Sequence, residues 1–78
     1  MNPRVREAYR AAQEELVRIP AWDADRVRDY LKNAVETKDV KELNREGHLW
    51  SGTIALRLFD LADAIKESMA CDSESENS

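Results

Sequence analysis

Apolar residues recur at intervals of three and four along nearly the whole chain, and this period restricts the fold to helices. In the first twenty residues they are Val5, Tyr9, Ala12, Leu16 and Ile19. An α-helix has 3.6 residues per turn, so these positions share one helix face. No segment shows the convincing alternation of apolar and polar residues that a half-buried strand requires. We therefore expect an all-α domain over residues 1–71.

The first helix is expected over residues 3–19. Asn2 is a favourable N-cap, and Pro3 suits the first helical turn because its missing N–H needs no partner there. Pro20 disfavours helical geometry at the residue before it, so the helix should end at Ile19.

The second helix is expected after a short connection at residues 20–22. Asp23 is a suitable N-cap, and Trp22 and Val27 have the spacing of a hydrophobic staple. The apolar stripe continues for two further turns, and the helix should end near residues 36–39.

Residues 39–70 allow two interpretations. One helical face is shared, across two glycines, by Val40, Leu43, Trp50 and Ile54. A single long helix explains that shared face, but Gly47 and Gly52 would each cost it about 1 kcal/mol relative to alanine. We favour a break at residues 46–49, because the first two helices are too short to cover one helix of this length. The expected fold is therefore a small three- or four-helix bundle.

The acidic character of the chain belongs mainly to its C-terminal end. Residues 72–78 contain Asp72, Glu74 and Glu76, which account for most of the net charge of −4, and they have no apolar side chain. Such a segment cannot repay the entropy of ordering, so we expect a disordered acidic tail. The remaining body is nearly neutral, which disfavours both a nucleic-acid mimic and a strong phosphate-binding surface.

No catalytic, metal or cofactor site is expected, and the protein is predicted not to be an enzyme. His48 and Cys71 are the only residues of their types, so they cannot complete a tetrahedral zinc site. Paired carboxylates such as Asp60 and Asp63 alternate with basic residues, as on a solvated helix face. His48 is interpreted as a surface or capping histidine rather than as a general base.

The expected location is the cytoplasm, without membrane insertion. No apolar run reaches the length that crosses a bilayer, and the N-terminal residues lack the apolar core of a signal peptide. A lone cysteine, Cys71, cannot form an intrachain disulfide and is typical of a reducing compartment.

An excess of apolar side chains in the last helix indicates a protein interface. Its apolar face is wide, Phe59 widens it further, and Leu49 and Leu56 fall outside it among charged residues. A chain of this length has few residues with which to cover them. The predicted interface residues are Leu49, Trp50, Leu56 and Phe59. Their partner is expected to be another protein or protein complex, with a homodimer as a further possibility.

The function favoured by these features is a non-enzymatic protein-binding module that regulates or inhibits a larger protein assembly. Small cofactor-free helical proteins of this kind include phage- and plasmid-borne inhibitors of host systems, such as anti-CRISPR proteins. That parallel rests on size and on the lack of other sites alone. The alternative is a small nucleic-acid-associated protein, which would use the first-helix arginines Arg4, Arg6, Arg10 and Arg18. Nucleic-acid binding is the less favoured of the two, because the body of the chain is nearly neutral.

Overall fold

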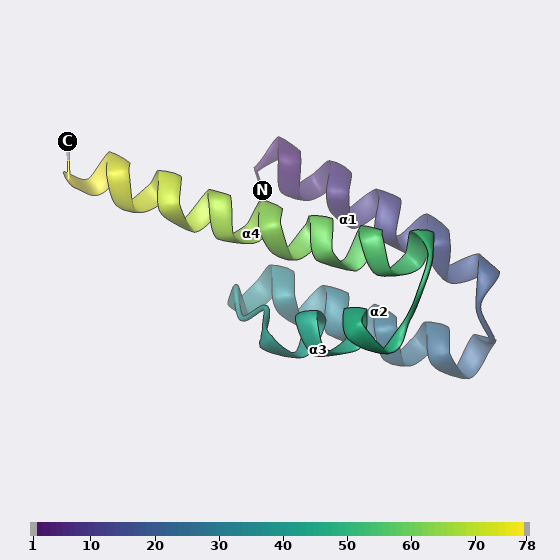
Figure 1. The fold of residues 1–78 in the computed structure, drawn as a ribbon. Coiled ribbons are helices and arrows are strands. Elements are labelled where there is room, and N and C mark those ends of the chain that lie inside the picture. Colours follow the sequence, from purple (N-terminus) through teal and green to yellow (C-terminus); the bar gives the residue numbers. More distant parts are fainter. Residues whose placement is uncertain (1, 78) are drawn as a thin grey trace.

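The computed structural model describes the backbone of residues 2–77 and the side chains of residues 2–70. Its elements in chain order are α1 (Pro3–Glu15), the 3-10 helix η1 (Leu16–Arg18), α2 (Ala21–Thr37), α3 (Lys41–Leu49) and α4 (Thr53–Asn77) (Figure 1). The described backbone contains no strand, so the prediction of an all-α bundle is confirmed, with four α-helices. The expected disordered tail at residues 72–78 lies outside the residues whose side chains are described, and it stays a prediction.

α4 is the central helix of the bundle. It lies between α1 on one side and α2 and α3 on the other, and its most extensive packing is against α1 and α3 (Figure 1). α1 runs antiparallel to α4. This direction follows from the ion pairs that Arg4, near the start of α1, forms with Asp60 and Glu67, well along α4. The short first helix therefore covers much of the apolar face of the longest one.

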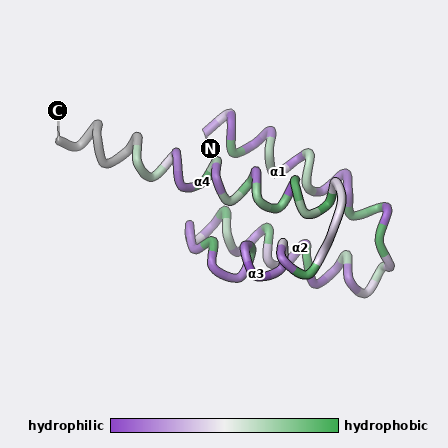
Figure 2. Tube along the Cα trace, in the orientation of Figure 1, coloured by the Kyte–Doolittle hydropathy of each residue, from purple (hydrophilic) through white to green (hydrophobic). Residues whose placement is uncertain are grey.

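The hydrophobic core receives side chains from all four helices. The largest fully buried ones are Val27, Leu31, Leu43, Leu58 and Leu61. The hydrophobic stretches of the chain are most continuous in the first half of α4, whereas hydrophilic stretches recur along α1 and α3 (Figure 2). This distribution is what a central helix requires, since its neighbours cover more than one of its faces.

The start of α1 agrees with the prediction. The side chain of Asn2 accepts a hydrogen bond from the backbone N–H of Arg4 at 2.8 Å, as an N-cap does. The end differs in detail, because the final turn tightens into η1. Ile19 is then extended, with φ −118° and ψ 162°, as the following Pro20 favours.

The prediction for the start of α2 is wrong. The helix begins at Ala21 directly after Pro20, so Asp23 lies inside its first turn and does not cap it. Trp22 is strongly exposed and therefore forms no hydrophobic staple with Val27. The physical reason is that Pro20, with its φ near −55°, is already suited to introduce a helix, and no connecting residues are needed.

The predicted break at residues 46–49 is also wrong in position, although a break exists. It lies at residues 50–52, between α3 and α4. Gly47 is buried within α3, where an added Cβ would come within 2.8 Å of the Phe59 ring. Gly52 has φ +80°, in the left-handed region that favours glycine. Gly47 thus permits close packing, whereas Gly52 provides the turn.

Candidate protein-binding site

Four helix ends meet at one end of the bundle. Because α1 is antiparallel to α4, η1 lies near the start of α4. Arg26, early in α2, contacts Glu46, late in α3, so the start of α2 lies beside the end of α3. The connection from η1 to α2 and the connection from α3 to α4 therefore lie at the same end, away from the N-terminus (Figure 1).

Exposed hydrophobic side chains are concentrated at this end, which we call the apolar end. Within residues 2–70, the large hydrophobic side chains that remain strongly exposed are Val17 (85%), Trp22 (77%), Leu49 (70%) and Leu56 (67%). All four belong to segments next to the two connections. Single exposed leucines are ordinary on protein surfaces, but hydrophobic side chains gathered at one end indicate an interaction site.

The apolar end consists of two corners. The proline corner (residues 16–28) leads from η1 through Pro20 into α2, and the glycine corner (residues 46–59) leads from α3 through Gly52 into α4. Val17 and Trp22 belong to the first, and the two exposed leucines belong to the second.

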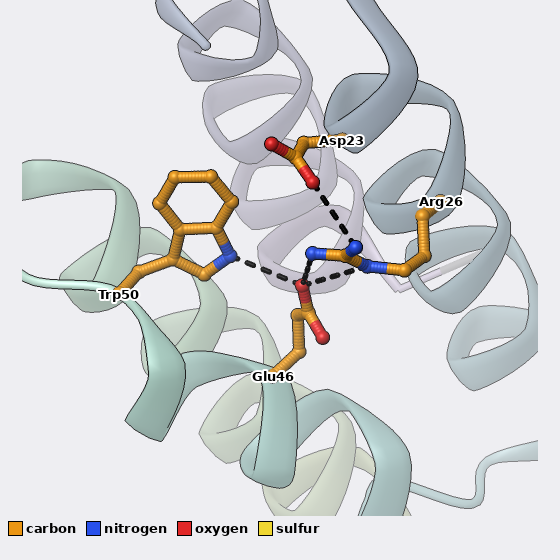
Figure 3. A network of polar contacts seen from close by, with 4 residues as sticks. All are labelled: Asp23, Arg26, Glu46 and Trp50. Atoms are coloured by element: carbon orange, nitrogen blue, oxygen red, sulfur yellow. Dashed lines mark hydrogen bonds and ion pairs between the residues drawn. The ribbon is translucent and has the colours of Figure 1, made fainter. Parts of the chain in front are cut away.

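A buried carboxylate organises the glycine corner. Glu46, only 4% exposed, lies in α3 and faces the start of α2. Its Oε1 atom accepts hydrogen bonds from Arg26 Nη2 at 2.8 Å, from Arg26 Nε at 3.2 Å and from Trp50 Nε1 at 3.1 Å (Figure 3). Arg26 Nη1 also pairs with Asp23 at 3.0 Å. Three donors from two segments therefore converge on one oxygen atom.

This network holds the end of α3 against α2. The pKa of Arg26 is raised above its ordinary value, and the hydrogen bond to Glu46 is the largest cause. A buried carboxylate is strongly unfavourable unless charged or polar donors satisfy it, and here Arg26 and Trp50 supply them. Because Leu49 lies between Glu46 and Trp50, the network also restrains the backbone that presents this exposed leucine.

Phe59 joins α4 to α3 at the same corner. Its ring lies against Gly47 and meets the His48 ring edge-on, with the two centroids 5.1 Å apart. Leu56 lies one turn earlier on α4 and remains exposed. The buried residues Ile54 and Leu58 lie on the opposite side of the helix from Leu56, which therefore faces solvent.

The structure brings the four predicted interface residues to one corner. Leu49 and Leu56 are exposed, whereas Trp50 and Phe59 are half-buried. Sequence reasoning missed Val17 and the exposure of Trp22. Val17 lies beside the apolar stripe of the first helix rather than on it, which is the signal that could have identified it.

The proline corner contains a shallow hollow of about 270 Å³. It is lined by Leu16, Val17, Ile19, Ala21 and Ala24 and by the charged residues Asp25 and Arg28. Asp25 and Arg28 form an ion pair with each other at 3.0 Å, and both are exposed. The hollow therefore combines an apolar lining with one charge of each sign.

The four predicted nucleic-acid contacts are exposed but differ in their surroundings. Arg4 pairs with two carboxylates of α4, and Arg18 lies 3.8 Å from Glu15. Arg6 and Arg10 form no ion pair with any residue in the part of the chain whose side chains are described. Arg6 and Arg10 are thus the two members of the predicted set that no described carboxylate engages.

The described residues hold no group of three or more His, Cys, Asp or Glu side chains arranged to bind a metal ion. His48 is exposed, and its ring contact is with Phe59. No helix within the described residues is both long and apolar enough to span a bilayer.

Comparison of the chain with protein-family models, with curated proteins and with solved structures gives no match in any of the three.

Proposed function

We propose that this protein is a non-enzymatic binding module that docks on another protein through its glycine corner and thereby regulates or inhibits a larger assembly. The observation that carries the proposal is the pair of exposed leucines, Leu49 and Leu56, on a corner whose backbone is held from within. Exposed apolar side chains on a rigid support are the usual core of a protein interface.

The restraint of the glycine corner supports binding because it lowers the entropy lost on association. The hydrogen bonds of Glu46 and the packing of Phe59 on Gly47 fix the two segments that present the leucines. A surface that is already ordered loses less conformational freedom when a partner binds. Half-buried Trp50 beside Leu49 adds aromatic surface of the kind that interfaces favour.

The test is affinity capture with the wild-type chain and with a Leu49→Glu/Leu56→Glu variant, followed by titration of the purified partner by calorimetry. Both side chains are exposed, so the variant should keep the wild-type far-ultraviolet circular dichroism spectrum. We expect the captured partner to bind the wild-type chain and to lose at least tenfold in affinity with the variant, about 1.4 kcal/mol.

The matched control is Val17→Glu/Trp22→Glu, which also adds two negative charges, on exposed apolar residues of the other corner. It should bind the partner as the wild-type chain does. A partner that binds the double variant with unchanged affinity, or one whose binding is lost equally in the control, would overturn the assignment of the glycine corner.

A second candidate function is nucleic-acid binding, and the observation that favours it is that Arg6 and Arg10 on α1 form no ion pair with the side chains described for residues 2–70. They stand four residues apart and so lie on one helix face. Two cations that replace counterions on a polyanion would give a salt dependence with a slope near −2 in log–log form. Titration of the chain with DNA and RNA at several salt concentrations tests this, and absence of binding at low salt eliminates it.

A further inference from the structure

We propose that the proline corner is a homodimer interface, in which Trp22 of each copy enters the hollow of the other. The occupant of the hollow is thus a second copy of this chain. The proposal uses different residues from the docking surface at the glycine corner, and it does not depend on that function.

The first observation is that a protruding side chain and a hollow lie close to each other at the proline corner. Trp22 is 77% exposed, and the hollow of about 270 Å³ begins at the adjacent Ala21. Asp25, one turn beyond Trp22 on α2, also lines it. A dimer with two-fold symmetry requires a surface that complements itself, because each copy presents the same patch to the other. A projection beside a hollow satisfies that requirement.

The second observation is that the charges on the patch also complement themselves. Asp25 and Arg28 stand three residues apart on α2, pair with each other at 3.0 Å and are both exposed, so that either can also face a charge from outside. When two copies of α2 meet antiparallel across a two-fold axis, Asp25 of one copy can face Arg28 of the other. The same arrangement leaves no like charges opposed at this point.

The third observation concerns the hollow itself. Its lining residues Leu16 and Ala24 are buried core residues, so its apolar floor is part of the folded bundle. Val17 and Ile19 extend that floor toward the surface. An indole is a large planar apolar group with few rotatable bonds, which makes tryptophan a frequent anchor in such pockets.

The first test is solution mass by light scattering over a concentration series to the millimolar range. We expect the wild-type chain to rise from its monomer mass of 9.0 kDa toward twice that value. Trp22→Glu should hold the mass at that of the monomer throughout. Leu56→Glu, a change to the same residue at the other corner, should dimerise as the wild-type chain does.

Circular dichroism verifies that these variants remain folded, which the exposure of both side chains favours. A wild-type chain that stays monomeric at every concentration overturns the proposal. So does a dimer that Trp22→Glu leaves intact, or one that only Leu56→Glu disrupts, since self-association would then use the glycine corner.

A second test uses the two charges and is specific to a two-fold interface. Asp25→Arg gives a patch with two positive side chains, and Arg28→Asp gives a patch with two negative ones. Each variant alone should show a weaker dimer than the wild-type chain, because like charges oppose each other. An equimolar mixture should recover the dimer mass, since the two patches then attract each other. Failure of the mixture to recover it contradicts the antiparallel arrangement of α2.

Discussion

The two corners of the apolar end reverse the chain by different physical means. At the proline corner, Pro20 restricts the backbone, and the turn from η1 into α2 is completed with no side-chain cap. At the glycine corner, Gly52 permits a left-handed backbone, and Glu46 then holds the neighbouring segments through three hydrogen bonds. The restricted backbone of Pro20 determines the conformation of the proline corner, whereas the hydrogen bonds of Glu46 hold that of the glycine corner.

This difference determines what each corner leaves on the surface. A proline turn needs no side-chain partners, so Val17 and Trp22 are free to point outward. The glycine corner directs Trp50 and Phe59 inward to hold the two helices together, and only the leucines remain outside. We infer that, apart from Arg26, which binds Glu46 from α2, changes to side chains should weaken the glycine corner much more than the proline corner.

The largest effect is expected for Glu46→Ala. It removes the acceptor of Arg26 and Trp50 and leaves a cavity beside them. Breaking a buried ion pair costs about 3–5 kcal/mol, and the partial exposure of Arg26 should reduce the loss to about 2–3 kcal/mol. Urea unfolding followed by circular dichroism measures this free energy.

The control for this change is Glu42→Ala, also in α3. Its carboxylate is exposed and lies 3.7 Å from Arg45. A surface pair in the first helical turn should contribute less than about 1 kcal/mol. Equal losses for the two glutamates would show that the buried network does not set the stability of the glycine corner.

The second prediction is a double-mutant cycle between Gly47 and Phe59. In the wild-type background, Gly47→Ala places a Cβ within 2.8 Å of the Phe59 ring and should destabilise the fold by about 1 kcal/mol. In a Phe59→Ala background the same change should stabilise it by about 1 kcal/mol, because alanine favours helix over glycine. Thermal and urea unfolding of the four proteins give the coupling energy, and identical effects in both backgrounds would refute the close contact.

A smaller effect is expected for Gly52→Ala, through the backbone alone. Its φ is +80° and an added Cβ would meet no atom within 4 Å, so strain is the only cost. We expect a loss of about 1 kcal/mol in the free energy of unfolding. Gly52→Asn should lose less, since asparagine tolerates the left-handed region better than alanine does.

The smallest effect is expected for Pro20→Ala at the proline corner. Alanine can adopt the backbone conformation of Pro20, with φ −55° and ψ 146°. The main effect of the substitution is therefore a more flexible unfolded chain, which loses more entropy on folding. Such substitutions alter stability by about 0.4–1 kcal/mol. Urea unfolding in dilute solution measures the loss. A loss as large as that of Glu46→Ala would remove the distinction between the two corners.

The sequence predicted the helices well because their apolar period is a local property. Helical spacing alone placed Val5, Ala12, Leu16 and Leu43 on apolar helix faces, and all four are buried. The break was predicted at residues 46–49, around Gly47, but lies at residues 50–52, at Gly52, and the reason for this error is non-local. Helix propensity treats Gly47 and Gly52 alike, and they are distinguished by the approach of Phe59 from α4 to Gly47 and by the left-handed backbone of Gly52.

The side-chain network of the glycine corner was not predictable from local patterns. Arg26 and Glu46 are twenty positions apart, and their contact depends on how α2 packs against α3. A partial signal existed, since Glu46 follows Leu43 by three positions and so occupies the apolar stripe of its helix. A charged residue on such a stripe indicates either a functional site or a buried pair.

The convergence of three donors on one Glu46 oxygen has a consequence for sequence change over evolutionary time. Loss of Glu46 alone deprives both Arg26 and Trp50 of their acceptor, and loss of Arg26 alone leaves the buried carboxylate without a cation. Replacement of all three by well-packed apolar residues leaves no buried polar group that needs a partner. Descendants of this chain should therefore retain Glu46 and Arg26 together or exchange them together, whereas Trp50 can change alone because the Arg26–Glu46 pair stays complete without it.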